Sequence, residues 1–530
     1  MSNPSAGPLP PTGVRQPPQV PPQAPKSPQA QQPYQPFETE KVPPPTTGPK
    51  SPQQIGHNRD PTETSIPLTD RLPAGPGPEP LNIVILGASF GGLSCAHHFL
   101  DYTIQRLRTT STAPNYRLII ISPSTHIYWN IGAPRALVKG GLLKHEDTFI
   151  AIEPGFARHK DLDWTLIQGK ALNVDPETRT IELECFNFEA QKRCSILLPR
   201  RNSTPNTPST PLPRIQTLPY HALIMCTGTS AHSDLLSLHG PHLETADALN
   251  RFHTQVAQAK SIVICGGGTS GIEVAGQLAT YLNHTAHFPF RRRVRNPKQI
   301  ILITGGDRCL PGIPNPTVGA KAEKYLAKLG VEVKHNVRVL KAQEWFDQTG
   351  ATRIDLSDDT QLIADVYVAC TGVAPNSDYA PSYLKDEKNY ILTNNATMRC
   401  DLAGDRVYAL GDVASYSQNY VPDVYAAVPV VMHNLLNDLL THELHLASPY
   451  GGNDDRIEQL VDETYNQRPN DSQLCPITRF GGVGILLGLK LPKVMVHLLK
   501  GHDYRVCKAK GVVVDGGNPY AVPVTPGKYE

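Results

Sequence analysis

Short apolar runs that end on glycine recur along this chain, and the spacing of the apolar positions changes after each of them. The first run, residues 82–86, meets Gly87, and apolar residues then recur at helical spacing over residues 93–104. A continuous apolar run followed by glycine and a 3.6-residue period is typical of a buried strand, a tight turn and a helix. The pattern therefore predicts a strand–turn–helix unit over residues 82–104.

A second unit of the same kind begins at residue 261. The apolar run 261–265 leads into Gly266, Gly268 and Gly271, which complete the spacing G-x-G-x-x-G, and a helical period follows over 272–282. In this spacing the first glycine makes the turn, the second lets the backbone approach a pyrophosphate, and the third lets helix and strand pack closely. Because the strand before the motif and the helix after it supply the context that the motif needs, the second unit predicts a dinucleotide site.

The first turn is an incomplete copy of this motif. Gly87 and Gly92 hold the outer places, but Ser89 stands where the middle glycine is expected. The next predicted strand, residues 116–122, ends on serine instead of the acidic residue that binds a ribose hydroxyl in such folds. Taken alone, the first turn is open to two interpretations, a nucleotide site or a packing turn.

Other segments continue the alternation of strands and helices. Short alternating runs over residues 164–199, the last of them at 195–198, predict a β-meander, and residues 337–363 predict a second one. A helical pattern covers residues 425–440. Three further strands are predicted to end on small or polar pairs, which are Thr227-Gly228, Thr371-Gly372 and Gly411-Asp412.

Length, charge and cysteine usage narrow the class of protein. A chain of 530 residues exceeds one ordinary core, so two or three domains are expected. The net charge of +2 argues against a dedicated nucleic-acid binder, and no nucleic acid is expected as a partner. The ten cysteines show no C-x-x-C pair, which indicates neither a zinc site nor a disulfide framework. With no targeting signal and no apolar run long enough for a bilayer, we expect a cytoplasmic protein.

Taken together, these motifs resemble those of the two-dinucleotide-domain flavoproteins. The motifs are the complete glycine motif, the incomplete copy ahead of it and the three strand ends. In that family an NAD(P)H domain is inserted into an FAD domain, and the likeness covers roughly residues 82–415. It implies an α/β fold with two Rossmann-like dinucleotide-binding domains and a C-terminal α+β region, and the proline-rich composition of residues 1–80 predicts a disordered N-terminal tail ahead of them. It implies FAD and NAD(P)H as cofactors. The residues implied on the FAD side are Gly87, Ser89, Gly92, Thr227, Gly228 and Asp412, and those on the NAD(P)H side are Gly266, Gly268, Gly271, Thr371 and Gly372.

The implied domain boundaries follow these motifs. The segments are a Pro-rich tail (1–80), a first FAD-binding part (81–258, with a low-complexity insertion at 200–215), an NAD(P)H-binding domain (259–364), a second FAD-binding part (365–420) and a C-terminal region (421–530).

Two further segments resemble one branch of that family. Residues 126–136 are similar to a segment of the smaller apoptosis-inducing-factor-like flavoproteins, which include a ferroptosis-suppressing ubiquinone reductase, and residues 479–484 and 499–504 are similar to the tail of the same branch. Type II NADH dehydrogenases are related in mechanism. Many disulfide reductases carry a C-x4-C pair after the first helix, whereas Cys95 stands alone here. The resemblance therefore implies electron transfer from flavin to a quinone-like or other small acceptor without a redox-active disulfide.

Three charged residues are candidates for roles around the cofactors. Glu273 matches a glutamate near flavin and nicotinamide in those quinone reductases, where it could relay a proton, or it complements the helix dipole. Arg135 pairs either with an FAD phosphate or with a helix end. Residues 299–304 form a strand that ends without an acid, so Arg308, or the arginine run at 291–295, suits the 2′-phosphate of NADPH, and NADH stays open. The branch often has a lysine just before the helix near residue 425, and residues 422–424 offer none.

Two segments raise the question of partners. Residues 484–499 are apolar with interspersed lysines, which suits either peripheral contact with a membrane or a packed helix pair, in the core or in a homodimer interface. The tail holds nearly half of the 51 prolines, and its P-x-x-P spacing fits an SH3-type or WW-type partner or a solvated tail. Two rival functions stay open: an apoptosis-inducing-factor-like signalling flavoprotein with little turnover, and a scaffold that acts through the tail.

Overall fold

Parallel strands with helices between them form the centre of the protein, as the α/β prediction requires. The computed structural model describes residues 79–107, 113–139, 143–198, 212–285, 292–345, 350–467, 469–478 and 480–520. The predicted Pro-rich tail, apart from residues 79 and 80, most of the predicted insertion at 200–215, and Arg291 lie outside these ranges. Among the helices of the described ranges, none combines the length and the apolarity needed to cross a membrane.

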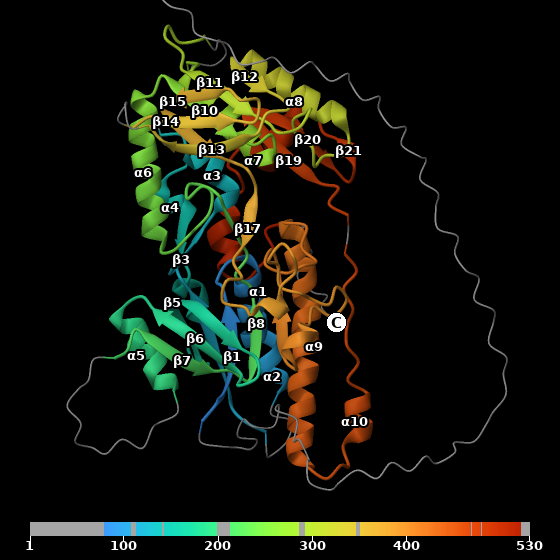
Figure 1. Ribbon diagram of the computed structural model, residues 1–530. Coiled ribbons are helices and arrows are strands. Elements are labelled where there is room, and N and C mark those ends of the chain that lie inside the picture. Colours follow the sequence, from blue (N-terminus) through green and yellow to red (C-terminus); the bar gives the residue numbers. More distant parts are fainter. Residues whose placement is uncertain are drawn as a thin grey trace, which may run out of the picture. The chain divides into compact units, whose positions relative to one another are not determined.

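The first sheet has seven strands in the order β18-β8-β1-β2-β5-β6-β7. Figure 1 labels β8, β1, β5, β6 and β7 among them. The adjacent strands from β18 to β2 all pair in parallel, and β2 also pairs in parallel with the start of β5. Every residue of β1 is buried, as expected for a parallel sheet that is covered on both faces. The strands are β1 (Leu81–Leu86), β2 (Tyr116–Ser122), β5 (Trp164–Asp175), β6 (Thr180–Cys185), β7 (Ile215–Pro219), β8 (Ala222–Met225) and β18 (Val407–Ala409).

A long helix covers the first sheet together with the helix of the first glycine turn. Helix α1 (Phe90–His98) continues through the π-helical η2 (Phe99–Thr103) into α2 (Ile104–Arg106), and it packs against α9 (Val421–Ala447). The helix predicted at 425–440 is confirmed and is longer than expected. It begins at Val421 because Pro422 suits the first turn of a helix, where its missing N–H has no helical partner to lose.

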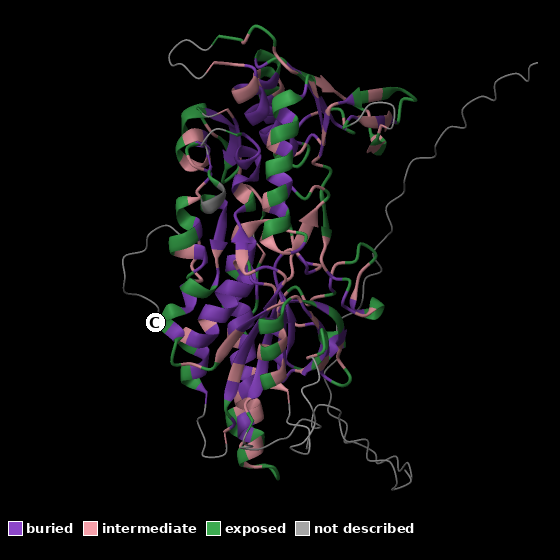
Figure 2. Cartoon of the chain, turned by 90° about the vertical axis from the view of Figure 1, so that its left-hand side faces the viewer, coloured by how far each residue is buried: buried purple, intermediate pink, exposed green. Residues whose placement is uncertain are grey.

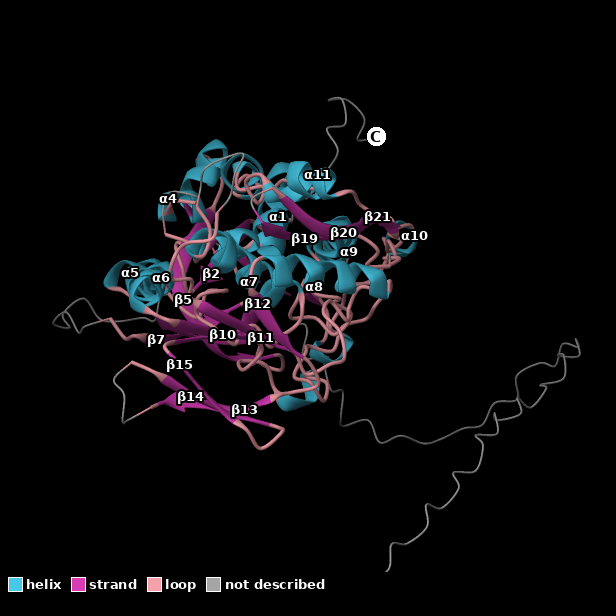
Figure 3. Ribbon diagram, turned by 90° about the horizontal axis from the view of Figure 1, so that it is seen from above, coloured by secondary structure: helices cyan, strands magenta, loops and turns pink. Residues whose placement is uncertain are grey.

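The second sheet has four parallel strands in the order β12-β11-β10-β16. Its two faces are covered differently, as Figure 3 shows: helices lie on one side and a three-stranded meander lies on the other. Ile262 and Ile264 of β10 join the helix-side core, whereas Val263 packs with Ile354 on the meander side. The elements are β10 (Ser261–Cys265), β11 (Gln299–Ile303), β12 (Val331–Lys334), β16 (Val366–Ala369), α6 (His242–Gln258), α7 (Thr269–Leu282), α8 (Pro316–Lys328), β13 (Val339–Glu344), β14 (Thr352–Leu356) and β15 (Gln361–Ala364).

One predicted strand of the first meander is wrong. Residues 195–198, expected as a strand, belong mostly to helix α5 (Phe188–Leu197), and the third meander strand is β7. The helix forms because the Asn187 side chain accepts a hydrogen bond from the Ala190 N–H at 2.8 Å, which caps its first turn. The apolar residues at its end had suggested a strand because a short apolar run is ambiguous between the two structures.

The C-terminal region is built differently from the helix pair considered for residues 484–499. Residues 473–490 of this region form an antiparallel sheet of β19 (Gln473–Thr478), β20 (Gly481–Leu486) and β21 (Leu489–Lys490), and the helical turns α11 (Lys493–Val496) and η7 (His497–Gly501) follow it. Strand β19 packs on α7 so closely that a Cβ at Gly276 would lie 2.3 Å from the Ile477 carbonyl oxygen. This close contact needs glycine at position 276.

The remaining elements are short. In Figure 2 buried residues concentrate in the strands and on inward helix faces, and exposed residues follow the outer faces. These short elements are β3 (His126–Tyr128), η3 (Asn130–Gly132), α3 (Ala133–Ala136), α4 (His145–Thr148), β4 (Phe149–Ala151), η4 (Glu153–His159), β9 (Thr229–Ala231), β17 (Val373–Pro375), η5 (Ser382–Leu384), η6 (Asp401–Ala403), α10 (Asp454–Glu458) and η8 (Ala509–Val513).

Candidate functional site

The first glycine turn joins β1 to α1 in a space that only glycine fits. Gly87 has φ +100°, and a Cβ there would lie 2.3 Å from the Cys226 carbonyl oxygen. A Cβ at Gly92 would lie 1.9 Å from the Gly87 carbonyl oxygen. The two outer glycines thus let the chain turn sharply and bring the N-terminus of α1 to the carboxyl end of β1.

A cavity of about 320 Å³ opens at this edge of the first sheet. Five residues singled out from the sequence line it together, although they come from three separate stretches of the chain: Gly87, Ser89, Thr227, Gly228 and Asp412. They meet because β1, β8 and β18 are parallel neighbours, so their carboxyl ends lie side by side. Gly92 packs beneath the turn against Gly87, outside the lining.

Two lining residues that the sequence reasoning missed hold Thr227 in place. Its hydroxyl donates to the Asn376 carbonyl oxygen at 2.7 Å and lies 3.0 Å from the Tyr379 hydroxyl, and the Asn376 amide donates to the Thr227 carbonyl oxygen at 2.9 Å. Lys170 and Ser122 also line the cavity, from β5 and from the end of β2. The sequence contained one signal for Asn376, which is that it follows the second Thr-Gly pair by only a few residues.

A small ribbon joins the two Thr-Gly pairs. Strands β9 and β17 run antiparallel, and each begins just after one pair, with Ala231 opposite Val373. His232 Nδ1 lies 2.7 Å from the Thr371 hydroxyl oxygen. The structure therefore brings together the ends of the two sheets that the sequence had marked with the same dipeptide.

Asp412 is the charged group in the lining that was expected there. Burial raises the pKa of Asp412, and the nearby Asp423 acts in the same direction, whereas a hydrogen bond donated by the Ser417 hydroxyl at 3.1 Å lowers it. Such a carboxyl group is stabilised in its ionised form by additional hydrogen-bond donors. A ligand that offers hydroxyl groups to Asp412 would supply them.

The second glycine turn repeats the geometry of the first. Gly266 has φ +120°, with a Cβ position 2.1 Å from the Cys370 carbonyl oxygen, and a Cβ at Gly271 would lie 1.9 Å from the Gly266 carbonyl oxygen. A Cβ at Gly268 would meet nothing within 4 Å. The protein itself therefore leaves open space above the middle glycine, where a pyrophosphate approaches the backbone in such folds.

The loop after β11 contains the residues expected to select the nicotinamide cofactor. Thr304 is buried at the strand end, and Arg308 is half-buried, with Nη2 donating to the Pro311 carbonyl oxygen at 3.0 Å. Arg338, which the sequence reasoning did not name, packs against Gly305 of the same loop: its Cγ lies 2.9 Å from the Cβ position there. Two arginines thus lie beside this loop.

Glu273 is buried near the start of α7 and forms an ion pair with Lys500. The Lys500 ammonium lies 2.7 Å from Glu273 Oε1 and also donates to the Leu474 carbonyl oxygen at 3.2 Å. Burial raises the pKa of Glu273, and the Lys500 charge opposes that rise. The sequence reasoning looked for a lysine ahead of α9, whereas the lysine beside Glu273 comes from the C-terminal region.

Arg135 lies in the same buried region and not in the lining of the cavity. Its guanidinium donates to the carbonyl oxygens of Gly501 and His502, both at 2.8 Å, and to Gln277 Oε1 at 3.2 Å. It also lies over the Tyr504 ring, 4.6 Å from the centroid. These contacts are those of the helix-end alternative, because Gly501 ends η7. Glu273 likewise lies outside the lining of the 320 Å³ cavity.

Comparison with known proteins adds a family and several relatives. The family model described as pyridine nucleotide-disulphide oxidoreductase matches residues 81–429. Oxidoreductase phnG of Penicillium herquei is 31% identical over 438 residues, which cover 81% of this chain and 95% of that protein. Ferroptosis suppressor protein 1 of Homo sapiens is 22% identical over 433 residues, covering 80% of this chain and 93% of that protein.

One solved structure resembles this chain in fold over nearly its whole length. NDH2 from Plasmodium falciparum, solved in complex with NADH, superposes with a TM-score of 0.52 at 13% sequence identity, covering 81% of this chain and 94% of that one. At this identity the likeness concerns the fold alone. Both glycine-turn units lie within the span that the family model matches.

Proposed function

Because the chain belongs to the pyridine nucleotide-disulphide oxidoreductase family, we propose that it is an FAD-dependent enzyme that oxidises NAD(P)H and reduces a quinone-like acceptor, without a redox-active disulfide. One observation carries the proposal: Gly87, Ser89, Thr227, Gly228 and Asp412 line one cavity at the carboxyl ends of three parallel strands. Ligands of open α/β sheets bind at this edge.

The residues of the first turn fit FAD. The turn offers the α1 N-terminus to a pyrophosphate, and the half-buried Asp412 carboxylate gains stability from hydroxyl donors such as those of a ribityl chain. FAD, when bound, supplies the two-electron chemistry that links a nicotinamide to an acceptor. The protein's own contribution is to orient this group and to exclude water from it, and Asn376 and Tyr379 do so by fixing Thr227 in the wall.

The second turn supports NAD(P)H as the electron donor. Gly268 leaves the backbone N–H groups at the α7 N-terminus open to a pyrophosphate. Arg308 lies in the loop where an NADPH 2′-phosphate would be bound, Arg338 packs against that loop, and no acidic residue ends β11. We therefore propose that NADPH binds more tightly than NADH.

Cysteine placement supports direct transfer to the acceptor. All ten cysteines lie within the described ranges, and all are free thiols. Cys95 lies in α1 and is fully buried, and no second cysteine follows it at the C-x4-C spacing. A buried thiol of this kind behaves as a small apolar side chain.

The C-terminal surface supports a lipid-like acceptor. Strands β20 and β21, the turns beside them and helix α11 with η7 expose large apolar side chains, which are Phe480, Leu486, Leu487, Leu489, Val494, Met495 and Leu498. The exposed Lys490 and Lys493 lie among them and suit anionic headgroups. We propose that this surface contacts a membrane peripherally, where a quinone would be met, and that Glu273 relays a proton from the Lys500 ammonium to the reduced acceptor.

The cofactor part of the proposal is tested with the purified full-length protein. We expect a visible flavin spectrum that is bleached anaerobically by NADPH at lower concentration than by NADH, and turnover with a short-chain benzoquinone. Asp412→Asn should lower flavin content, whereas the control Asp247→Asn, at an exposed position on α6, should not. Colourless protein that cannot be reconstituted with FAD would overturn the proposal.

The acceptor part has its own readouts. Cys95→Ala should keep quinone turnover, and its loss with flavin intact would contradict direct transfer. Co-sedimentation with vesicles that contain anionic lipid should fall for Leu487→Ser combined with Leu489→Ser. The paired control Leu340→Ser, at another exposed leucine, should bind as the original chain does. Equal sedimentation of all three proteins would contradict the proposed membrane contact but not the proposed oxidoreductase activity.

A further inference from the structure

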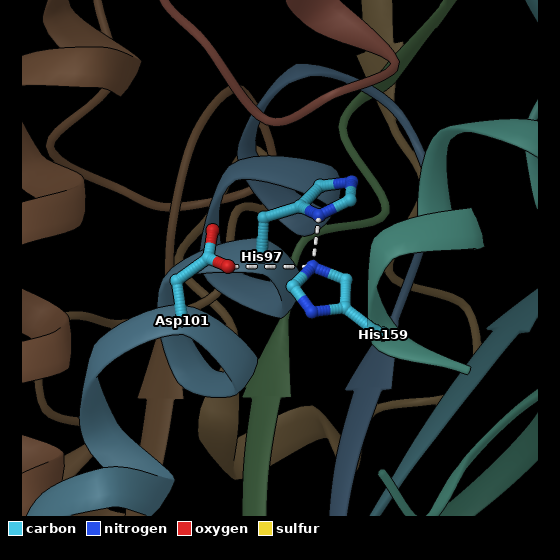
Figure 4. A group of neighbouring side chains, drawn as sticks. All are labelled: His97, Asp101 and His159. Carbon is cyan, nitrogen blue, oxygen red and sulfur yellow. Dashed lines mark hydrogen bonds and ion pairs between the residues drawn. The ribbon is translucent and has the colours of Figure 1, made fainter. Parts of the chain in front are cut away.

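Two histidines and one aspartate meet at a point outside the proposed cofactor site. His97 lies in α1, Asp101 in η2 and His159 at the end of η4, and Figure 4 shows their polar atoms converging. His97 Nδ1 lies 3.0 Å from His159 Nε2, and Asp101 Oδ1 lies 3.6 Å from the same His159 nitrogen. None of the three lines the 320 Å³ cavity, and the proposed oxidoreductase chemistry does not use them.

We propose that His97 Nδ1, His159 Nε2 and Asp101 Oδ1 bind one divalent transition-metal ion of the Zn²⁺ type. The three atoms lie within 4.8 Å of one another. Zn²⁺ takes nitrogen and carboxylate ligands at about 2.0–2.2 Å in a tetrahedron, whose ligand–ligand edges are then about 3.3 Å. Two of the three observed separations, 3.0 and 3.6 Å, bracket that edge.

The hydrogen bonds around His97 leave a lone pair on its Nδ1, which accepts the His159 Nε2 hydrogen that a bound ion would displace. His97 Nε2 lies 2.8 Å from the Val514 carbonyl oxygen, which can only accept, so Nε2 carries the hydrogen and Nδ1 is the unprotonated nitrogen. A backbone carbonyl in this position is the usual outer partner that orients a metal-binding imidazole.

Arg158 is the group that opposes a cation here. Its Nη2 lies 2.8 Å from Asp101 Oδ2, the oxygen that does not face the histidines, and the Asp515 carbonyl oxygen also accepts from it at 3.1 Å. The Arg158 Nε also donates to Asp101 Oδ1, at the longer distance of 3.4 Å, so Oδ1 is the oxygen that an ion would take more easily. Asp101 is 29% exposed, which gives the ion a route from solvent and leaves room for water as a fourth ligand.

The site is covered by the C-terminal segment. Besides the Val514 contact, Gly516 lies so close to His97 that a Cβ there would come within 2.6 Å of the His97 Cβ. An ion that fixes the two imidazoles therefore also holds residues 514–516 against α1. The described chain just before them carries two exposed trypsin sites, Lys508 and Lys510.

The test uses full-length protein freed of metal with a chelator and titrated with Zn²⁺ by calorimetry. We expect one ion per chain, and we expect Asp101→Asn and His159→Gln each to weaken binding at least about 10-fold. His433→Gln is the matched control, because His433 pairs with a single carboxylate, Glu463, at 3.9 Å. Co²⁺ in place of Zn²⁺ should give absorption bands at wavelengths longer than those of oxidised flavin. No saturable binding, or equal affinity in all four proteins, would overturn the proposal and leave a hydrogen-bonded histidine pair.

Proteolysis gives a second readout that does not depend on affinity. Zn²⁺ should slow tryptic cleavage at Lys508 and Lys510 in the original chain but not in Asp101→Asn. This variant keeps the shape of a partly exposed side chain and should fold, which its circular dichroism and flavin content check. Cleavage that is slowed equally in both proteins would contradict a site at these residues.

Discussion

The two strand–turn–helix units share a backbone and differ in what they place on it. In both, the first glycine has a positive φ and the third lies against the first, with a Cβ position 1.9 Å from a carbonyl oxygen. The middle place is Ser89 in one unit and Gly268 in the other, and a Cβ at Gly268 meets nothing within 4 Å. The outer glycines are therefore demanded by the fold, whereas the middle one matters only to a ligand, which explains how serine is accommodated.

The helices that follow the turns also bury different polar groups against the C-terminal region. Helix α1 buries the neutral His97 against the Val514 carbonyl oxygen, and α7 buries the Glu273–Lys500 ion pair. A neutral imidazole needs one hydrogen bond, whereas a buried carboxylate needs a counter-charge. The C-terminal region thus stabilises α1 through a hydrogen bond and α7 through an ion pair. Single substitutions can measure the two contributions to stability separately.

The largest effect is expected at the third glycine. Gly271→Ala should lower the free energy of unfolding by about 4 kcal/mol or more, because the new Cβ meets a backbone oxygen that cannot move away alone. Gly268→Ala should change it by less than about 0.5 kcal/mol while raising the KM for NAD(P)H. Thermal unfolding and steady-state kinetics check both. Equal losses of stability in the two variants would contradict the view that the fold requires Gly271 whereas only the ligand requires Gly268.

The next effect concerns the ion pair on α7. Lys500→Met should cost about 3 kcal/mol of stability at neutral pH, because Glu273 is then buried without its counter-charge. Adding Glu273→Gln should restore most of that loss, since the amide needs no counter-charge. Lys493→Met, at an exposed lysine nearby, serves as the control. Denaturant unfolding measures all four proteins, and a double variant no more stable than Lys500→Met would contradict the account.

A smaller effect distinguishes α1 by its pH dependence. The pKa of His97 is lowered to about 4 from an ordinary 6.5, so the unfolded chain binds the proton first and stability is lost as the pH falls from about 6.5 toward 4. The slope from this one group is at most about 1.4 kcal/mol per pH unit. In chelator-treated protein, His97→Gln should lose that part of the slope. An unchanged slope would mean that His97 is protonated equally in both states.

The smallest effect is expected at the middle place of the first turn. Ser89 begins α1 without a side-chain capping hydrogen bond, so Ser89→Gly should change stability by only about a few tenths of a kcal/mol. Thermal unfolding in the presence of excess FAD provides the measurement. A loss near that of Gly271→Ala would show that the serine side chain supports the turn itself.

Local sequence patterns predicted the two glycine turns, but they could not predict contacts between residues far apart in the sequence. Gly87 and Gly266 could be recognised because a strand, a turn and a helix are adjacent in sequence. Lys500 pairs with Glu273 across 227 positions, and no spacing rule connects them. The helix ending at Leu197 was misread because its apolar end dominated the pattern, although Asn187 offered a capping signal.

Strand β18 has a consequence for how the protein is made. It pairs with β8, placing Val407 beside Leu223, and Asp412 follows it into the cavity wall. The first sheet is therefore unfinished on the ribosome until the whole second sheet has been synthesised. Contacts of such high sequence separation form slowly, and β8 keeps an open edge in the meantime. Flavin addition during synthesis should promote folding only after residue 412 has emerged, and earlier nascent chains should depend on chaperones.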